Sequence, residues 1–154
     1  MTQSLFSILI TVQFLVIVLH DLVDIPGWTH GRQVRAVIGA RKFWLGTLIN
    51  AIFPGLAVAL AVIFFHRPRP VYVTSYWISY CAVTLLSAIT MWWIPYFLGA
   101  PEKLKRDYAR MYEGTRQVLP ARGDNPRPNL LHLCFHALFA VNLVIVVLMS
   151  VRAG

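Results

Sequence analysis

The residues best suited to chemistry are ionisable side chains at the ends of two long apolar segments. His20, Asp21 and Asp24 lie at the end of the first segment, and His132 and His136 lie near the start of the last. Residues four apart lie on one face of a helix, so His20 shares a face with Asp24 and His132 shares one with His136. Imidazoles and carboxylates placed this way serve metal ligation or acid–base catalysis.

One interpretation is a metal site. Two helices that each present a pair of ligands supply the four-ligand set that zinc or non-haem iron takes. A haem held by histidines from two helices is a less favoured variant. The predicted ligands are His20, Asp24, His132 and His136.

A second interpretation is acid–base chemistry without a metal, on an apolar or lipid-like substrate. A carboxylate beside His20, most directly Asp21, would orient that imidazole as a base. His132 or His136 would be the partner acid. Candidates for holding a developing oxyanion are Asn50 and Tyr96.

A third interpretation is structural. The residues that end the first segment would lie at the level of lipid head groups, and His132 and His136 would form hydrogen bonds between helices. The spacing alone does not separate these three interpretations, because any polar pair on one helix face satisfies it.

The composition predicts which elements position these residues. The chain has 154 residues, of which 58% are hydrophobic and 13% charged, against roughly 45–50% and 25% in soluble domains. A disordered chain, a collagen, a disulfide scaffold and a water-soluble enzyme are excluded. Cys81 and Cys134 form no C-x-x-C pair and are typical of buried thiols.

Four segments have the length of about 20 residues that a bilayer requires. The sequence therefore predicts one all-α integral membrane domain over residues 1–154, a four-transmembrane-helix bundle. Its spans are residues 5–22, 43–65, 71–97 and 130–151, joined by long loops at 23–42 and 98–129. From Lys103 to Leu119, apolar residues recur on one side, which predicts an amphipathic helix lying in the membrane interface with its aromatic side chains toward the lipid.

Lys and Arg counts predict the orientation. The two long loops hold eleven of these residues, and the opposite side holds Arg67, Arg69 and Arg152. Both loops are therefore expected in the cytoplasm and both termini outside it, in a plasma (inner) membrane. The net charge of +8 then indicates contact with anionic lipid head groups rather than with nucleic acid.

This orientation brings the polar side chains to one depth. His20 and Asp21 end a span that enters the cytoplasm, while His132 and His136 begin a span that leaves it, and Asn50 falls near the same level. We therefore expect a polar vestibule in the cytoplasmic third of the bilayer.

Four spans with two large cytoplasmic loops are similar in outline to the membrane-associated eicosanoid and glutathione metabolism proteins and to the emopamil-binding-type isomerases. The acidic and arginine positions of those helices have no counterpart here, so the resemblance is one of architecture and carries no function.

Two classes of function remain open. The first is an enzyme or binder that acts on an apolar small molecule taken from the cytoplasmic leaflet. The second is a non-catalytic transporter, channel or structural subunit whose histidines serve packing; a transporter of this size would need a homo-oligomer to enclose a path.

Overall fold

The computed structural model describes residues 2–151, and about 75% of the chain is helical, with no strand in that range. The helices are α1 (Thr2–Leu22), α2 (Gly31–Ile38), α3 (Ala40–Ile63), α4 (Val71–Ala88), the π-helix η1 (Ile89–Trp93), α5 (Ile94–Leu98), α6 (Glu102–Met111) and α7 (Leu130–Val151).

Four helical stretches are long and apolar enough to cross a membrane, as the sequence predicts. The third runs without interruption through α4, η1 and α5, from Val71 to Leu98. The helix predicted at 103–119 is shorter, because α6 ends at Met111 and a turn follows in which Gly114 adopts a φ of 75°.

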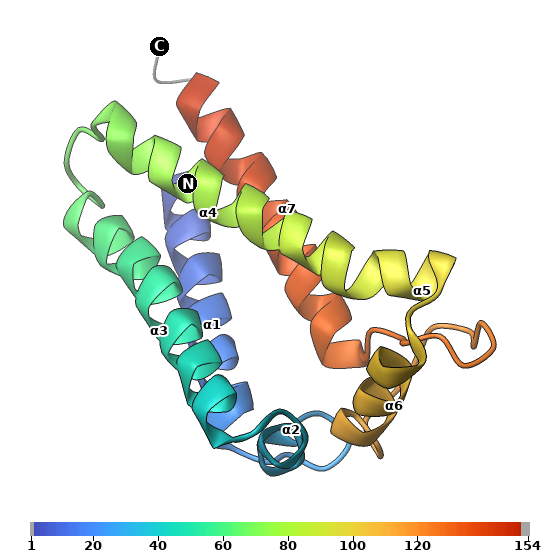
Figure 1. Cartoon of the computed structure of the whole chain (residues 1–154). Coiled ribbons are helices and arrows are strands. Elements are labelled where there is room, and N and C mark those ends of the chain that lie inside the picture. Colours follow the sequence, from blue (N-terminus) through green and yellow to red (C-terminus); the bar gives the residue numbers. More distant parts are fainter. Residues whose placement is uncertain (1, 152–154) are drawn as a thin grey trace.

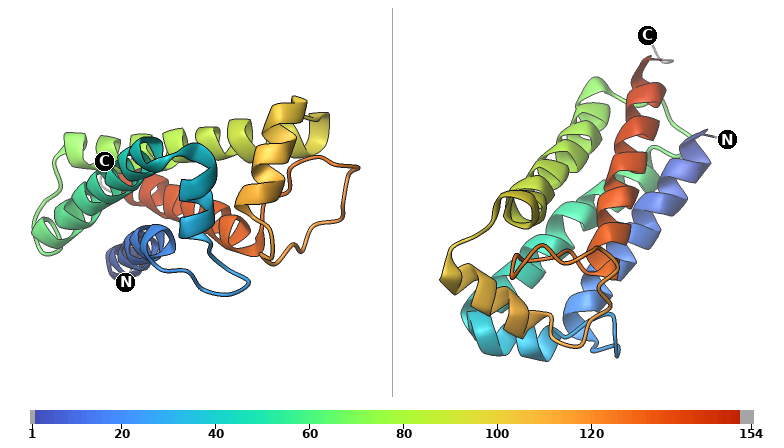
Figure 2. Two further views of the ribbon diagram at one scale, coloured as in Figure 1. Left: turned by 60° about the horizontal axis from the view of Figure 1, so that its bottom comes forward. Right: turned by 90° about the vertical axis from the view of Figure 1, so that its right-hand side faces the viewer.

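The long helices form two arms that diverge from one end of the molecule (Figure 1). One arm is α1 with α3, and the other is α4 with α7. The start of α1, the end of α7 and the α3–α4 connection lie together at the narrow end, while α2 and α6 lie across the wide end. Two further views of the ribbon show the same arrangement (Figure 2).

An apolar cluster fills the narrow end. The rings of Phe6 and Trp77 lie 4.8 Å apart, and the Trp77 indole donates a hydrogen bond of 3.0 Å to the Ala57 carbonyl. Small residues on α3 permit this close approach, because Ala57 and Ala61 are both buried against the other helices. The other buried members are Ile10, Val73, Ile145, Val146 and Met149.

A buried amide pair sets α1 against α7 below this cluster. Asn142 donates a 2.7 Å hydrogen bond to the Gln13 side-chain oxygen, and both side chains are completely buried. A polar pair in apolar surroundings is costly unless its members meet, so this contact fixes the register of the two helices.

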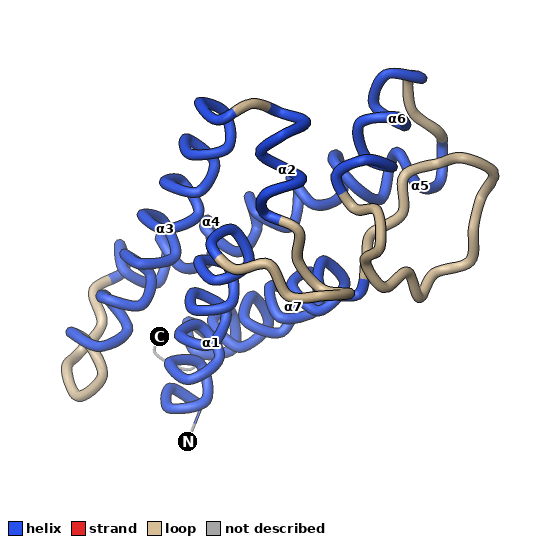
Figure 3. The backbone as a smooth tube through the Cα atoms, turned by 90° about the horizontal axis from the view of Figure 1, so that it is seen from below, coloured by secondary structure: helices blue, strands red, loops and turns tan. Residues whose placement is uncertain are grey.

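The wide end is covered by α2, α6 and the loops at 23–30 and 112–129, which face the viewer in Figure 3. The two loops are joined by the backbone, since Arg116 donates to the Gly27 carbonyl at 2.8 Å and accepts from Leu130 at 2.9 Å. The cover is therefore one connected layer and not two independent loops.

The apolar face of α6 packs against protein. Tyr108 and Met111 are buried in a cluster with Trp92, alongside Val34 and Val37 of α2. The Tyr108 hydroxyl donates to the Met91 carbonyl at 2.8 Å, which Pro95, four residues later, cannot reach for want of an N–H. The prediction that the aromatic residues of this amphipathic helix point into lipid is therefore wrong for Tyr108.

We predict that Gly31→Ala destabilises the fold. A Cβ at Gly31 would lie 2.5 Å from the Asp21 carbonyl oxygen, so the start of α2 would have to leave α1. The expected loss is about 1–3 kcal/mol, measured by unfolding of the purified protein in detergent. Gly46→Ala is the matched control, because a Cβ there meets nothing within 4 Å and alanine favours a helix. Equal stability of the two variants would contradict the packing described for Gly31.

Candidate functional site

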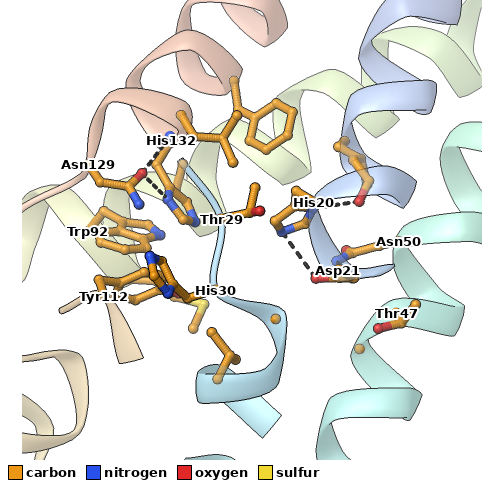
Figure 4. A pocket seen from close by; sticks show the side chains of 18 of the residues that line it. His20, Asp21, Thr29, His30, Thr47, Asn50, Trp92, Tyr112, Asn129 and His132 are labelled. Carbon is orange, nitrogen blue, oxygen red and sulfur yellow. Dashed lines mark hydrogen bonds and ion pairs between the residues drawn. The ribbon is translucent and has the colours of Figure 1, made fainter. Parts of the chain in front are cut away.

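A cavity of about 410 Å³ lies between the two arms at the wide end. Its walls come from α1, α3, α4, η1 and α7, and the loops before α2 and α7 add residues to its cover (Figure 4). The polar residues that line it are His20, Asp21, Thr29, His30, Lys42, Thr47, Asn50, Thr84, Ser87, Tyr112, Asn129, His132 and His136.

One wall carries a charged cluster from α1 and α3. The ring nitrogen Nδ1 of His20 faces the Ile17 carbonyl, and Nε2 lies 3.1 Å from Asp21 Oδ1. The Asn50 amide donates to the other oxygen of Asp21 at 3.2 Å. The Ile17 carbonyl and the Asp21 carboxylate both accept hydrogen bonds, so they orient the His20 ring between them.

The opposite wall carries His132, held by the residue that starts α7. Asn129 is buried, and its side-chain oxygen accepts the His132 backbone N–H at 3.0 Å, the geometry of a helix N-cap. The same oxygen lies 2.7 Å from His132 Nδ1. Asn129 therefore starts the helix and orients the imidazole at once.

Aromatic side chains surround His132. Its ring centroid is 4.1 Å from that of Trp92 and 5.3 Å from that of Tyr112. Trp92 comes from η1, and π-helical turns of this kind occur frequently at functional sites because they redirect side chains. Burial raises the pKa of Tyr112, so its hydroxyl stays neutral at physiological pH.

The two walls face each other. The ring centroids of His20 and His132 are 6.4 Å apart with their planes perpendicular, and both rings point into the cavity (Figure 4). His136 lies one turn further along α7, 6.4 Å from His132. The structure therefore brings five of the predicted site residues to one cavity: His20, Asp21, Asn50, His132 and His136.

Tyr96 does not line this cavity. Its hydroxyl donates to the Pro120 carbonyl at 3.0 Å, and Arg122 lies over its ring. Its carbonyl also accepts from Asn125 at 3.1 Å. Tyr96 therefore anchors the loop at 112–129, and the structure gives no support to the prediction that it holds an oxyanion.

Asp24 also lies apart from His20, because it holds the start of α2. Its carboxylate accepts from the Arg32 backbone at 3.2 Å and pairs with the Arg32 guanidinium. The hydrogen bond from the Arg32 guanidinium lowers the pKa of Asp24 from its usual 3.8. The contact therefore contributes to folding at neutral pH and is lost as the pH falls from that value through the lower pKa of the folded state.

Within residues 2–151, no three His, Cys, Asp or Glu side chains are grouped closely enough to hold a metal ion. The predicted set of His20, Asp24, His132 and His136 is not assembled, because Asp24 turns to Arg32. The geometry therefore does not support the predicted zinc or iron site.

Sequence reasoning missed the contributions of the cover. Thr29 and His30 precede α2, and Tyr112 follows α6, so none of these three residues belongs to a span. The one signal for Asn129 was its place after Pro128 at a helix start, a position where asparagine caps helices. For Trp92, the signal was the proline three residues later, which favours an irregular turn.

Three buried polar atoms of the lining have no hydrogen-bond partner among the described residues. They are His30 Nε2, Asn129 Nδ2 and His136 Nδ1. Buried polar groups in proteins are nearly always paired. Four further atoms of this kind lie outside the cavity, on Ser7, Gln13, Gln117 and Asn142.

Comparison with protein families, curated proteins and solved structures found no significant match.

We predict that Asn129→Ser keeps the stability of the protein while Asn129→Leu loses about 1 kcal/mol. Serine is as good an N-cap as asparagine, whereas leucine leaves the His132 N–H without its acceptor. Unfolding in detergent measures both variants. Loss of stability in the serine variant equal to that in the leucine variant would show that the cap is not what Asn129 contributes.

Proposed function

We propose that this protein is a small integral membrane enzyme that performs acid–base chemistry on an apolar, lipid-like molecule from the cytoplasmic leaflet. The observation that carries the proposal is the placement of the His20–Asp21 pair opposite His132 across a cavity. The four long apolar helices are the transmembrane spans of this proposal.

The orientation follows from the positive-inside rule. The wide end, with α2, α6 and their basic loops, would face the cytoplasm, and the narrow end would face outward. The cavity then lies in the inner part of the bilayer, and the exposed basic residues of the cover, including Arg35, Arg106 and Arg110, would meet anionic lipid head groups.

A route from the lipid into the cavity is supported by the separation of α3 from α4. Near their connection these helices are tied by the Tyr76 hydroxyl, which donates to the Phe53 carbonyl at 2.7 Å. Further toward the wide end, Asn50 and Thr47 line one side of the cavity and Ser87 and Met91 the other. Ser87 and Met91 are exposed, so this rim would face acyl chains.

The two walls suit different roles in proton transfer. The His20–Asp21 pair, which the sequence suggested as the base, has Nε2 facing a carboxylate oxygen and is the candidate acid in this proposal. His132 donates through Nδ1 to Asn129, so its other nitrogen is the candidate base. Asn50 keeps Asp21 in place through its 3.2 Å hydrogen bond and is a positioning residue.

A transporter or channel requires a polar route across the whole bundle. The narrow end is instead filled by apolar side chains around Trp77, and the buried Gln13–Asn142 pair lies between that cluster and the cavity. This packing favours a site closed at one end over a path, and so an enzyme or binder over a transporter.

The test is isotope incorporation into lipids. Purified protein is reconstituted in vesicles of total membrane lipid extract, in water enriched in deuterium and oxygen-18. Hydrolysis introduces the oxygen label, and proton transfer at carbon introduces deuterium. We expect labelled lipid with the wild-type protein and a rate about 10²–10⁴-fold lower for His132→Gln, as expected for loss of a general base.

His66→Gln is the matched control, since His66 is exposed in the α3–α4 connection at the narrow end. This variant should incorporate label at the wild-type rate. Equal incorporation by the wild-type protein and His132→Gln, or none by either, would contradict the proposed chemistry.

A further inference from the structure

The protonation state of His132 can be read from its neighbours. The His132 backbone N–H donates to one end of the Asn129 amide at 3.0 Å, and only the oxygen of that amide can accept it. His132 Nδ1 lies 2.7 Å from this same oxygen, so Nδ1 must carry a proton. In the neutral ring, Nε2 therefore presents a lone pair and acts as an acceptor.

No described residue donates to this lone pair. The hydrogen bonds of the His132 ring within residues 2–151 are those that Nδ1 makes to Asn129, and the ring itself lines the cavity (Figure 4). Nε2 is open to the cavity, because it is not one of the buried polar atoms that lack a partner. A ligand in the cavity that donates a hydrogen bond can therefore reach Nε2.

A charged ligand is disfavoured at His132 Nε2. A cationic ligand would need a free counter-ion, but both oxygens of Asp21 are engaged, by His20 and Asn50. Lys42 at the cavity wall would also repel it. A carboxylate ligand would place its own lone pairs against His132 Nε2 and could not donate to it.

Apolar side chains make up about half of the lining residues. Trp28, Phe135 and Phe139 border the cavity, with Ile17, Val34 and Leu131. Such a surface suits a hydrocarbon body, and the rim between α3 and α4 gives that body a way toward acyl chains. A cavity of about 410 Å³ is at the small end of the usual range for ligand sites, which suits one chain or one ring system rather than a two-chain phospholipid.

The geometry points to a membrane-soluble alcohol as the ligand, with its neutral hydroxyl donating to His132 Nε2 and its apolar body toward the lipid. This inference rests on the proposed function in taking the cavity as the substrate site, and it names the class of that substrate. It also directs the hydroxyl proton toward the nitrogen proposed above as the base.

The experiment compares four saturated probes of one chain length: the alcohol, its methyl ether, the carboxylic acid and the alkane. Protein labelled with nitrogen-15 in its histidines is placed in lipid vesicles, and each probe is titrated while the His132 Nε2 resonance is followed. The alcohol should shift this resonance and bind about tenfold more tightly than the ether, which cannot donate.

His132→Phe identifies the resonance and removes the acceptor while it keeps an aromatic ring against Trp92. In this variant the alcohol and the ether should bind equally. His66→Phe, at the exposed connection of the narrow end, should keep the tenfold preference. Because the affinities of the wild-type protein for the alcohol and the ether can be compared without an assigned resonance, the inference is testable even if His132→Phe fails to fold.

The inference is overturned if the ether or the acid shifts Nε2 and binds as tightly as the alcohol, or if the preference survives in His132→Phe. Its failure is distinct from failure of the proposed function. Isotope incorporation without an alcohol preference would reject the substrate class alone, whereas an alcohol preference without incorporation would reject the chemistry and leave a binding site.

Discussion

The structure of the cavity depends on one oxygen atom. The Asn129 side-chain oxygen accepts both the backbone N–H and the ring Nδ1–H of His132, at 3.0 and 2.7 Å. The first contact ends the loop and begins α7, and the second fixes which ring nitrogen carries the proton. Helix start and imidazole chemistry are therefore coupled, because a change that removes the cap also frees the ring that faces His20.

Much of this arrangement could be predicted from the sequence. Apolar length alone predicts the four long helices, and the antiparallel courses of α1 and α7 place His20 and His132 at one level, as the 6.4 Å between their rings bears out. Both predictions rest on local properties, namely residue type and a rise of 1.5 Å per residue. Spacing could not decide between Asp21 and Asp24 as the partner of His20.

The rest depends on long-range contacts that periodicity does not encode. Asp24 turns to Arg32 because α2 folds back against α1, where Gly31 has no side chain to prevent it. Tyr108 leaves the expected lipid face because the Met91 carbonyl, out of reach of Pro95, offers it an acceptor. An amphipathic pattern indicates that one face of a helix is covered, but it does not identify what covers that face. Here protein and lipid are alternative coverings of the same surface.

Polar side chains pair differently at the two ends of the bundle. At the level of Gln13 and Asn142 the amides meet each other, and the helices close around them. At the wide end the arms diverge, and His20 with Asp21, and Asn129 with His132, pair within their own walls instead of across the gap. Side chains that served only to join the arms would have met across it, as Gln13 and Asn142 do. The polar groups of the wide end are therefore oriented within their own walls, which is the arrangement that the proposed function requires for a third molecule between them.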